Sequence, residues 1–153
     1  MQAWQAYIQL TEKRIAAELS GPRKFLVTDF LGDAPARSAR SVLGSGQVYI
    51  QRMETKDENG REILVKDGMI HHWLGAILVR GAKLNTLLRW VQDYEHHDRY
   101  FKEVEQSKLL SRQGNEFKIF FRLRRTKVIT VYYNTYHTAV YREHGPRRAS
   151  SNS

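Results

Sequence analysis

Two pairs of adjacent histidines are the side chains of this sequence best suited to metal chemistry: His71 and His72, and His96 and His97. Together with the carboxylates Glu95 and Asp98, they supply ligand types that zinc or iron accepts. Their spacing argues against a metal centre, because neighbouring side chains diverge by about 100° on a helix and point to opposite faces of a strand. We therefore expect no metal and no other cofactor. One histidine of each pair should lie at the mouth of a cavity, and the other should face solvent.

The sequence shows no arrangement typical of a catalytic nucleophile. Cysteine is absent, which excludes disulfides and thiolate metal sites, and no G-x-S-x-G motif occurs. We predict no catalytic residue and keep an enzyme as an alternative.

The composition is that of one globular domain. The chain has 153 residues, of which 41% are hydrophobic and 27% charged, so it can bury a core and is unlike a disordered sequence. Its formal net charge of +9 suggests an acidic partner, either nucleic acid or an anionic membrane surface. No apolar run reaches the roughly 18 residues of a membrane span, and the start lacks an export signal, so we expect a cytoplasmic protein as given.

The first half of the chain predicts one helix, a connector and several strands. Apolar residues recur at helical spacing over 3–19, whereas 32–46 is rich in Gly, Ala and Ser and predicts an irregular connector with one short helical turn. From residue 47 the period becomes two. The turn sequence DENG, Asp57 to Gly60, predicts a hairpin between its flanking segments, and 69–79 predicts a long strand.

The second half predicts a helix, a polar break, a short second helical piece and an antiparallel meander. Four apolar residues share one face of the first helix, and burying them would contribute at most about 6 to 12 kcal/mol: Leu84, Leu87, Leu88 and Val91. The periodicity lapses over 93–98, and strands follow at 107–112, 116–125 and 127–143. The polar segment 145–153 should be a disordered tail.

The middle strand of the meander has two unlike faces. Phe117, Ile119, Phe121 and Leu123 alternate with Lys118, Phe120, Arg122 and Arg124. One face is therefore apolar and the other basic.

This order of elements carries a family resemblance. The segments WLGAILVRGAKLNTLLRWVQDYEHHDRYF and VEQSKLLSRQGNEFKIFFRL resemble the START-like (SRPBCC) superfamily. The "HHW-G" motif (His71, His72, Trp73 and Gly75) and the "V-TV-YNT" motif at 128–135 resemble an uncharacterized bacterial subgroup, and the resemblance covers 68–143. It implies an α+β class and a helix-grip fold, a curved antiparallel sheet packed on helices. We therefore divide the chain into an N-terminal helix and connector at 1–46, a START-like domain at 47–144 and the tail.

The chain departs from the family pattern at both ends. A helix-grip fold is normally completed by further strands and a long C-terminal helix, which this sequence lacks after residue 144. We favour a truncated reading frame, and therefore an incomplete fold, over the alternative that the helix at 3–19 fills the gap. The resemblance also implies export if a preceding signal is missing from this chain.

The resemblance implies non-catalytic binding or transport of a small hydrophobic ligand, such as a lipid, sterol or polyketide, in a cavity between sheet and helix. The candidate ligand-binding residues are Trp73, Leu88, Tyr94, His96, Phe117, Ile119, Phe121, Val131 and Tyr133. Each could equally be an ordinary core residue. A cyclase or dehydratase on the same fold is an alternative function, for which the resemblance makes Tyr94, His96 and Tyr132 candidates for general acid or base roles.

A nucleic-acid-binding module is the other alternative. It rests on a basic strand segment with one aromatic residue, a pattern that can follow a phosphate backbone and stack a base: Lys118, Phe120, Arg122, Arg124, Arg125 and Lys127. The same pattern is typical of the solvated face of a sheet, so nucleic acid is the less favoured partner. The basic patch could also dock on an anionic membrane surface. The sequence does not indicate an oligomeric state.

Overall fold

The computed structural model describes residues 2–66 and 68–153 and confirms the α+β class. The chain divides into two compact units, residues 1–80 and 81–153, and each is described by itself. Among the described residues, no helix combines the length and the apolar character that crossing a membrane requires.

The first unit begins with helix α1 (Gln2–Leu19), which confirms the helix predicted at 3–19. A short 3-10 helix, η1 (Val27–Phe30), leads into helix α2 (Asp33–Gly44). We had expected an irregular connector there, and the structure differs. Pro35 lies in the first turn of α2, where its missing N–H costs no hydrogen bond, and Ala39 in the middle of the helix is buried. Small residues therefore allow close helix packing here instead of marking a loop.

The strands of the first unit pair differently from our prediction. Strand β1 (Tyr49–Arg52) pairs antiparallel with β2 (Trp73–Ala76), so the partner of β1 lies beyond the predicted hairpin. The DENG turn does form, with Gly60 at φ 76° and the Asp57 side chain accepting two backbone N–H groups. Within 2–66 and 68–80, the part of this unit that the structure describes, one isolated bridge, between Lys56 and Glu62, flanks the turn. A short apolar run does not specify which strand it pairs with. The pairing depends on which other parts of the protein bury one face of the strand.

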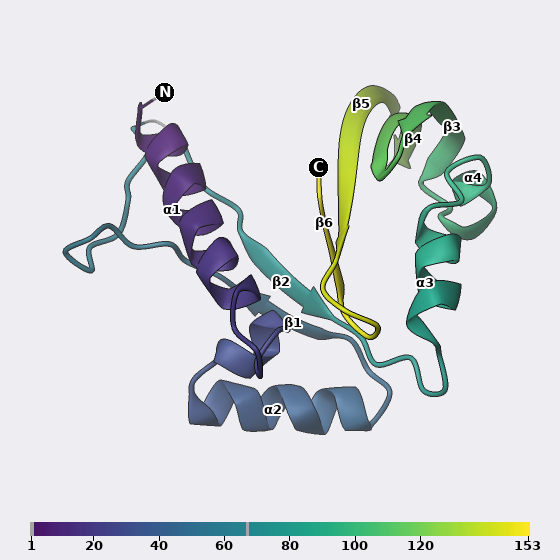
Figure 1. The fold of residues 1–153 in the computed structure, drawn as a ribbon. Helices are drawn as coiled ribbons and strands as arrows, with labels where there is room; N and C mark the ends of the chain where they lie inside the picture. Colours follow the sequence, from purple (N-terminus) through teal and green to yellow (C-terminus); the bar gives the residue numbers. More distant parts are fainter. Residues whose placement is uncertain (1, 67) are drawn as a thin grey trace. The chain divides into compact units, whose positions relative to one another are not determined.

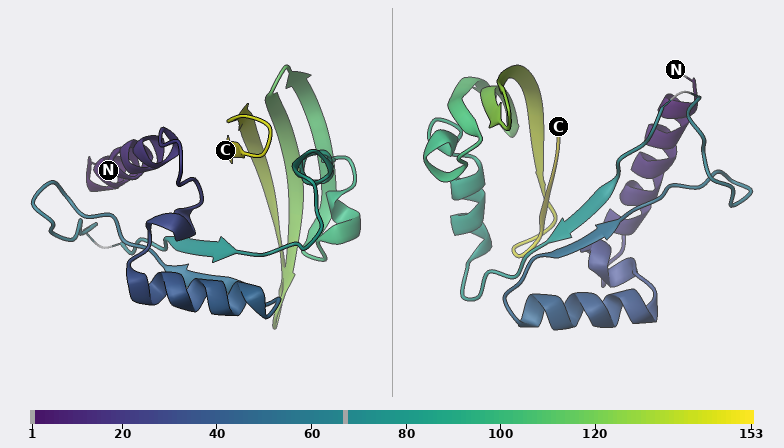
Figure 2. Two further views of the ribbon diagram at one scale, coloured as in Figure 1. Left: turned by 60° about the horizontal axis from the view of Figure 1, so that its bottom comes forward. Right: turned by 180° about the vertical axis from the view of Figure 1, so that it is seen from behind.

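A hydrogen-bonded network joins α1 to the β1–β2 ribbon, and Figure 2 shows the helix lying along it. The buried Tyr7 hydroxyl accepts the backbone N–H of Thr55 at 3.0 Å and lies 2.9 Å from His72 Nδ1. The hydroxyls of Thr11 and Thr55 are 2.6 Å apart. Thr55 follows β1 and His72 precedes β2. One face of α1 therefore contacts both chain segments that continue the two strands at this end of the ribbon.

The second unit is a four-stranded antiparallel sheet with two helices (Figure 1). Helices α3 (Leu84–Val91) and α4 (His97–Tyr100) precede four strands in the order β3 (Val104–Gln113), β4 (Glu116–Thr126), β5 (Thr130–Glu143) and β6 (Ala149–Asn152). The predicted helix, polar break, second helical piece and meander are confirmed.

Strand β6 lies in the segment that we expected to be mobile. It pairs with β5, from Glu143 opposite Ala149 to Val140 opposite Asn152. Gly145, at φ 87°, lies in the turn between them. Strand pairing uses backbone groups, so a mostly polar segment, with Ala149 as the apolar side chain of its strand, can still add to the edge of β5.

The core of the second unit lies between the helices and one face of the sheet, the inner face. Five buried residues form it: Tyr94, Phe117, Ile119, Ala139 and Tyr141. Leu88 and Val91 of α3 pack against this cluster but are only partly buried, and Leu87 is 38% exposed. The predicted apolar face of β4 is therefore confirmed, whereas α3 gains less from burial than the upper bound given above.

Replacing Phe117 tests this core. Its side chain is 1% exposed, so Phe117→Ala should lower the free energy of unfolding by about 3 to 5 kcal/mol, because it removes apolar contacts and leaves a cavity. Lys118→Ala, the neighbouring position on the outer face, should change it by less than about 0.5 kcal/mol. Urea denaturation followed by circular dichroism measures both. Equal effects of the two substitutions would contradict the assignment of the faces.

Candidate ligand-binding site

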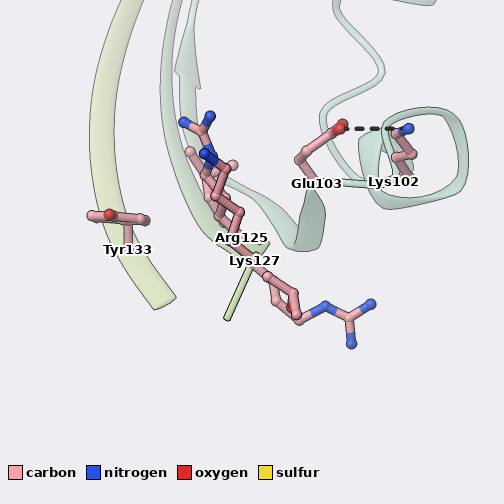
Figure 3. Close-up of a pocket in the computed structure, with 8 residues that line it drawn as sticks. Lys102, Glu103, Arg125, Lys127 and Tyr133 are labelled. Atoms are coloured by element: carbon pink, nitrogen blue, oxygen red, sulfur yellow. Dashed lines mark ion pairs between the residues drawn. The ribbon is translucent and has the colours of Figure 1, made fainter. Parts of the chain in front are cut away.

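A pocket of about 730 Å³ lies at the end of the sheet where β4 turns into β5. Figure 3 shows Arg125 and Lys127 between Tyr133 and the Lys102–Glu103 pair. The pocket is lined by Lys102, Glu103, Leu123, Arg124, Arg125, Thr126, Lys127 and Tyr133. Its volume falls within the range of small-molecule sites in proteins, about 300 to 1,000 Å³.

The strand register places these side chains. Leu123 pairs with Tyr133, and Arg125 pairs with Val131, so all four residues belong to the inner face of the sheet. The backbone N–H of Arg124 donates to the carbonyl of Glu103 at 2.8 Å and joins the α4–β3 connection to β4. The sheet and this connection therefore form two walls of the pocket.

The β4–β5 turn is held by two local contacts. The hydroxyls of Thr126 and Thr130 lie 3.0 Å apart, and the N–H of Lys127 donates to the carbonyl of Ile129 at 3.2 Å. These contacts position Lys127 at the rim of the pocket beside Arg125.

The pocket is positively charged over an apolar floor. Four of its lining residues are cationic, Lys102, Arg124, Arg125 and Lys127, and Glu103 is its one carboxylate. Glu103 lies 4.0 Å from Lys102, but the two side chains are 63% and 91% exposed, so water weakens this ion pair. Leu123 and Tyr133 provide the apolar surface. An apolar molecule with an anionic group matches both features.

The nine predicted ligand-binding residues do not form one site in the structure. Trp73 lies in β2 of the first unit, and its side chain is exposed. Tyr94, Phe117 and Ile119 belong to the core, and Leu88 and Phe121 pack against it. His96 is half-buried, and so is Val131, which lies near the β4–β5 turn. Tyr133 is the predicted residue that lines the pocket.

Tyr94 has a structural role. Its hydroxyl lies 2.5 Å from that of Tyr141, and its carbonyl accepts a hydrogen bond from the Ser107 hydroxyl. Burial, and secondly the hydrogen bond to Tyr141, raise the pKa of Tyr94 far above its ordinary value, so the phenol stays neutral.

The three candidates for acid–base catalysis do not converge. Tyr94 lies on the inner face of the sheet, whereas Tyr132 pairs with Arg124 on the outer face. His96 Nδ1 lies 2.7 Å from the Asp93 carboxylate. These side chains therefore define no common centre.

The two histidine pairs differ: His71 and His72 both line one small pocket of the first unit, whereas His96 and His97 have different surroundings. His97, not His96, is the buried member of its pair, with its ring 4.9 Å from that of Tyr94 and stacked on Phe121 at 5.8 Å. Among the described residues, its Nε2 has no hydrogen-bond partner. Throughout residues 2–66 and 68–153, no three His, Asp or Glu side chains are close enough to share a metal ion.

All four cationic residues of the pocket were absent from the predicted site: Lys102, Arg124, Arg125 and Lys127. We had assigned Arg125 and Lys127 to the basic strand face with Lys118. The register shows instead that Arg125 shares the inner face with Leu123, and Lys127 lies in the turn. Counting in twos from Leu123 would have found Arg125, whereas no sequence signal indicated Lys102.

No protein-family model matches this chain, and neither a curated protein nor a solved structure is significantly similar to it. The resemblance to the START-like superfamily therefore stays a prediction that rests on the motifs described above.

The first unit has a smaller pocket beside its histidine pair. Its volume is about 190 Å³, and it is lined by Trp4, Tyr7, Ile8, Thr11, Glu12, Ile70, His71 and His72. Burial, and secondly the positive charge of Arg14, lower the pKa of His72 below its ordinary value of 6.5. The Nδ1 atom of a neutral His72 can accept a hydrogen bond from the Tyr7 hydroxyl, which keeps the α1 network intact.

This lowered pKa predicts acid sensitivity of the first unit. Because the folded unit binds the His72 proton less readily than the unfolded chain, the stabilisation is complete above about pH 6.5 and is lost as the pH falls through the lowered pKa. His72→Asn keeps an acceptor oxygen near the position of Nδ1 and does not titrate. The urea midpoint of the native protein should therefore fall more than that of the variant between about pH 7.5 and 5.5. Trp4, which stacks on Tyr7, reports unfolding by fluorescence. Equal falls in the two proteins would refute the role of His72.

Proposed function

We propose that this protein binds or transports a small hydrophobic ligand that carries a negative charge, without catalysing a reaction on it. The supporting observation is the pocket at the β4–β5 turn, in which Leu123 and Tyr133 lie beside Arg125 and Lys127. The START-like resemblance of 68–143 supports the same class of ligand. A fatty acid, or a sterol or polyketide with an acidic group, has the required chemistry.

The two parts of the ligand would contact different parts of the pocket. Its apolar portion would cover Leu123 and the ring of Tyr133 and remove them from water. Its carboxylate or phosphate would face Arg125, whose planar guanidinium can make two parallel hydrogen bonds, with Lys127 and Lys102 adding charge.

The lining residues favour binding over catalysis. They include no histidine, and their one carboxylate, Glu103, is 63% exposed. A cyclase or dehydratase would need a positioned proton donor or acceptor. The uncharged hydroxyls in the lining belong to Tyr133 and to Thr126, and the Thr126 hydroxyl already contacts that of Thr130. The pocket therefore supplies shape and charge rather than an acid–base pair.

We also propose that residues 81–153 form part of a helix-grip fold. An antiparallel sheet follows the α3–α4 pair in the chain and packs on it through one face. This is the order and packing that the START-like resemblance implies. It makes a ligand site on the inner face of the sheet the natural place to test.

A fluorescent fatty acid with a free carboxylate, and its neutral methyl ester, test the ligand. The carboxylate probe should bind the native protein more tightly than the ester, because only the carboxylate can pair with the pocket cations. Arg125→Gln with Lys127→Gln should weaken carboxylate binding by about tenfold or more, equivalent to about 1.4 kcal/mol, and leave ester binding unchanged. Fluorescence titration measures these affinities.

Lys108→Gln with Lys118→Gln is the matched control, since it removes the same charge from the other face of the sheet. This control should retain native affinity. Equal losses in the two double variants would show that only net charge matters, and failure of both probes to bind would reject the proposal.

A further inference from the structure

The outer face of the β3–β6 sheet, opposite the core, combines exposed aromatic rings with cations. On it, Phe120 lies between Lys108 of β3 and Tyr136 of β5 in one cross-strand row. The Tyr136 side chain is 73% exposed, and its ring centroid lies 5.3 Å from that of Phe120. Tyr132, 47% exposed, lies on the same face, four residues before Tyr136 on β5.

The aromatic rings are fixed in position by their neighbours. The Arg122 guanidinium lies 4.7 Å from the centre of the Tyr132 ring, and the Glu105 carboxylate holds the same guanidinium at 2.9 Å. Phe120 is half-buried and supports Tyr136. Exposed aromatic rings that are already ordered lose little conformational entropy when a flat partner stacks on them.

Cations outnumber carboxylates on this surface. Lys108, Lys118, Arg122 and Arg124 belong to it, against Glu105 and Glu116. Glu105 pairs with Arg122, whereas no ion pair in the described part of the chain involves Lys108 or Lys118. The two lysines flank the Phe120–Tyr136 rings, one on the neighbouring strand and one two residues earlier on β4. Positive charge is therefore available beside the rings.

We propose that this outer face binds single-stranded nucleic acid. Unpaired bases would stack on Tyr136 and Tyr132, and the phosphates would pair with Lys108 and Lys118. Stacking on aromatic rings above a basic surface is the way in which proteins hold single strands without reading their sequence. The bases of a duplex already stack on one another, so the rings favour a single strand.

Single-stranded nucleic acid complements this surface in two ways, through its negative charge and through bases that can stack on the tyrosine rings, whereas an anionic membrane offers only the charge. A membrane would be attracted to the same lysines, but it offers no flat rings to Tyr132 and Tyr136. Those tyrosines lie within β5, paired to β4, and not on a loop that could enter a bilayer. The arrangement of aromatic and cationic side chains therefore matches nucleotides better than lipid headgroups.

Fluorescence anisotropy with a labelled oligouridylate of about 16 nucleotides tests the proposal. Tyr136→Ser and Tyr132→Ser should each weaken binding on the order of tenfold through lost stacking. Lys108→Gln with Lys118→Gln should reduce the slope of log affinity against log salt by about 1.4, because two phosphate contacts are lost at about 0.7 each. Circular dichroism verifies that each variant is folded.

Arg125→Gln with Lys127→Gln serves as the control of equal charge and should leave the slope unchanged. Equal affinity for the single strand and for a duplex of the same length would overturn the proposal, and so would unchanged affinity in both tyrosine variants. Binding to phosphatidylserine vesicles without binding to the oligonucleotide would assign the surface to a membrane instead. The residues changed in the oligonucleotide test and in the fatty-acid test have opposite roles in the two experiments, so the two proposals can fail separately, although Arg124 borders both the pocket and this surface.

Discussion

The position of Tyr94 in the break between α3 and α4 is the constraint on which the second unit depends. Its ring packs 5.7 Å from Phe117, its carbonyl accepts the Ser107 hydroxyl of β3, and its own hydroxyl bonds to Tyr141 of β5. One residue thus connects the helices with three strands. A buried phenol requires a hydrogen-bond partner, so the Tyr141 contact also fixes where the helix pair can lie on the sheet.

Packing on one face leaves the two sides of the sheet with different chemistry. The inner face is apolar near Phe117 and Ile119, and it becomes cationic at Arg125, where the helices no longer cover it. Side chains of the outer face do not contribute to that core, and they include charged and aromatic residues such as Lys118 and Tyr136. Strict alternation along β4 and β5 therefore gives one small unit an amphipathic pocket and a separate basic surface.

The first unit is held together by polar contacts to a larger extent. Tyr7 and Thr11 of α1 reach the β1–β2 ribbon through hydrogen bonds with Thr55 and His72, and Tyr7 is among the few buried residues there. A network of this kind depends on the protonation state of its members more than an apolar core does. The histidine pair that first suggested a metal ligand thus has a structural partner in Tyr7.

The sequence by itself determined α3 and the alternating faces of β4, whose side chains repeat with a clear period, and it also located the weakly amphipathic helix α1. Tertiary structure decided what depends on contacts between distant segments. It paired β1 with β2 and the polar segment Ala149–Asn152 with β5, and it buried Ala39 in a helix where composition had suggested a loop. The pocket belongs to the same class, because Lys102 and Arg125 come together only through the pairing of β3 with β4 and the contact of Glu103 with Arg124. The free energy of strand pairing and of burial depends on contacts between segments that are distant in the sequence. A short stretch of sequence therefore does not determine which segments pair or which side chains are buried.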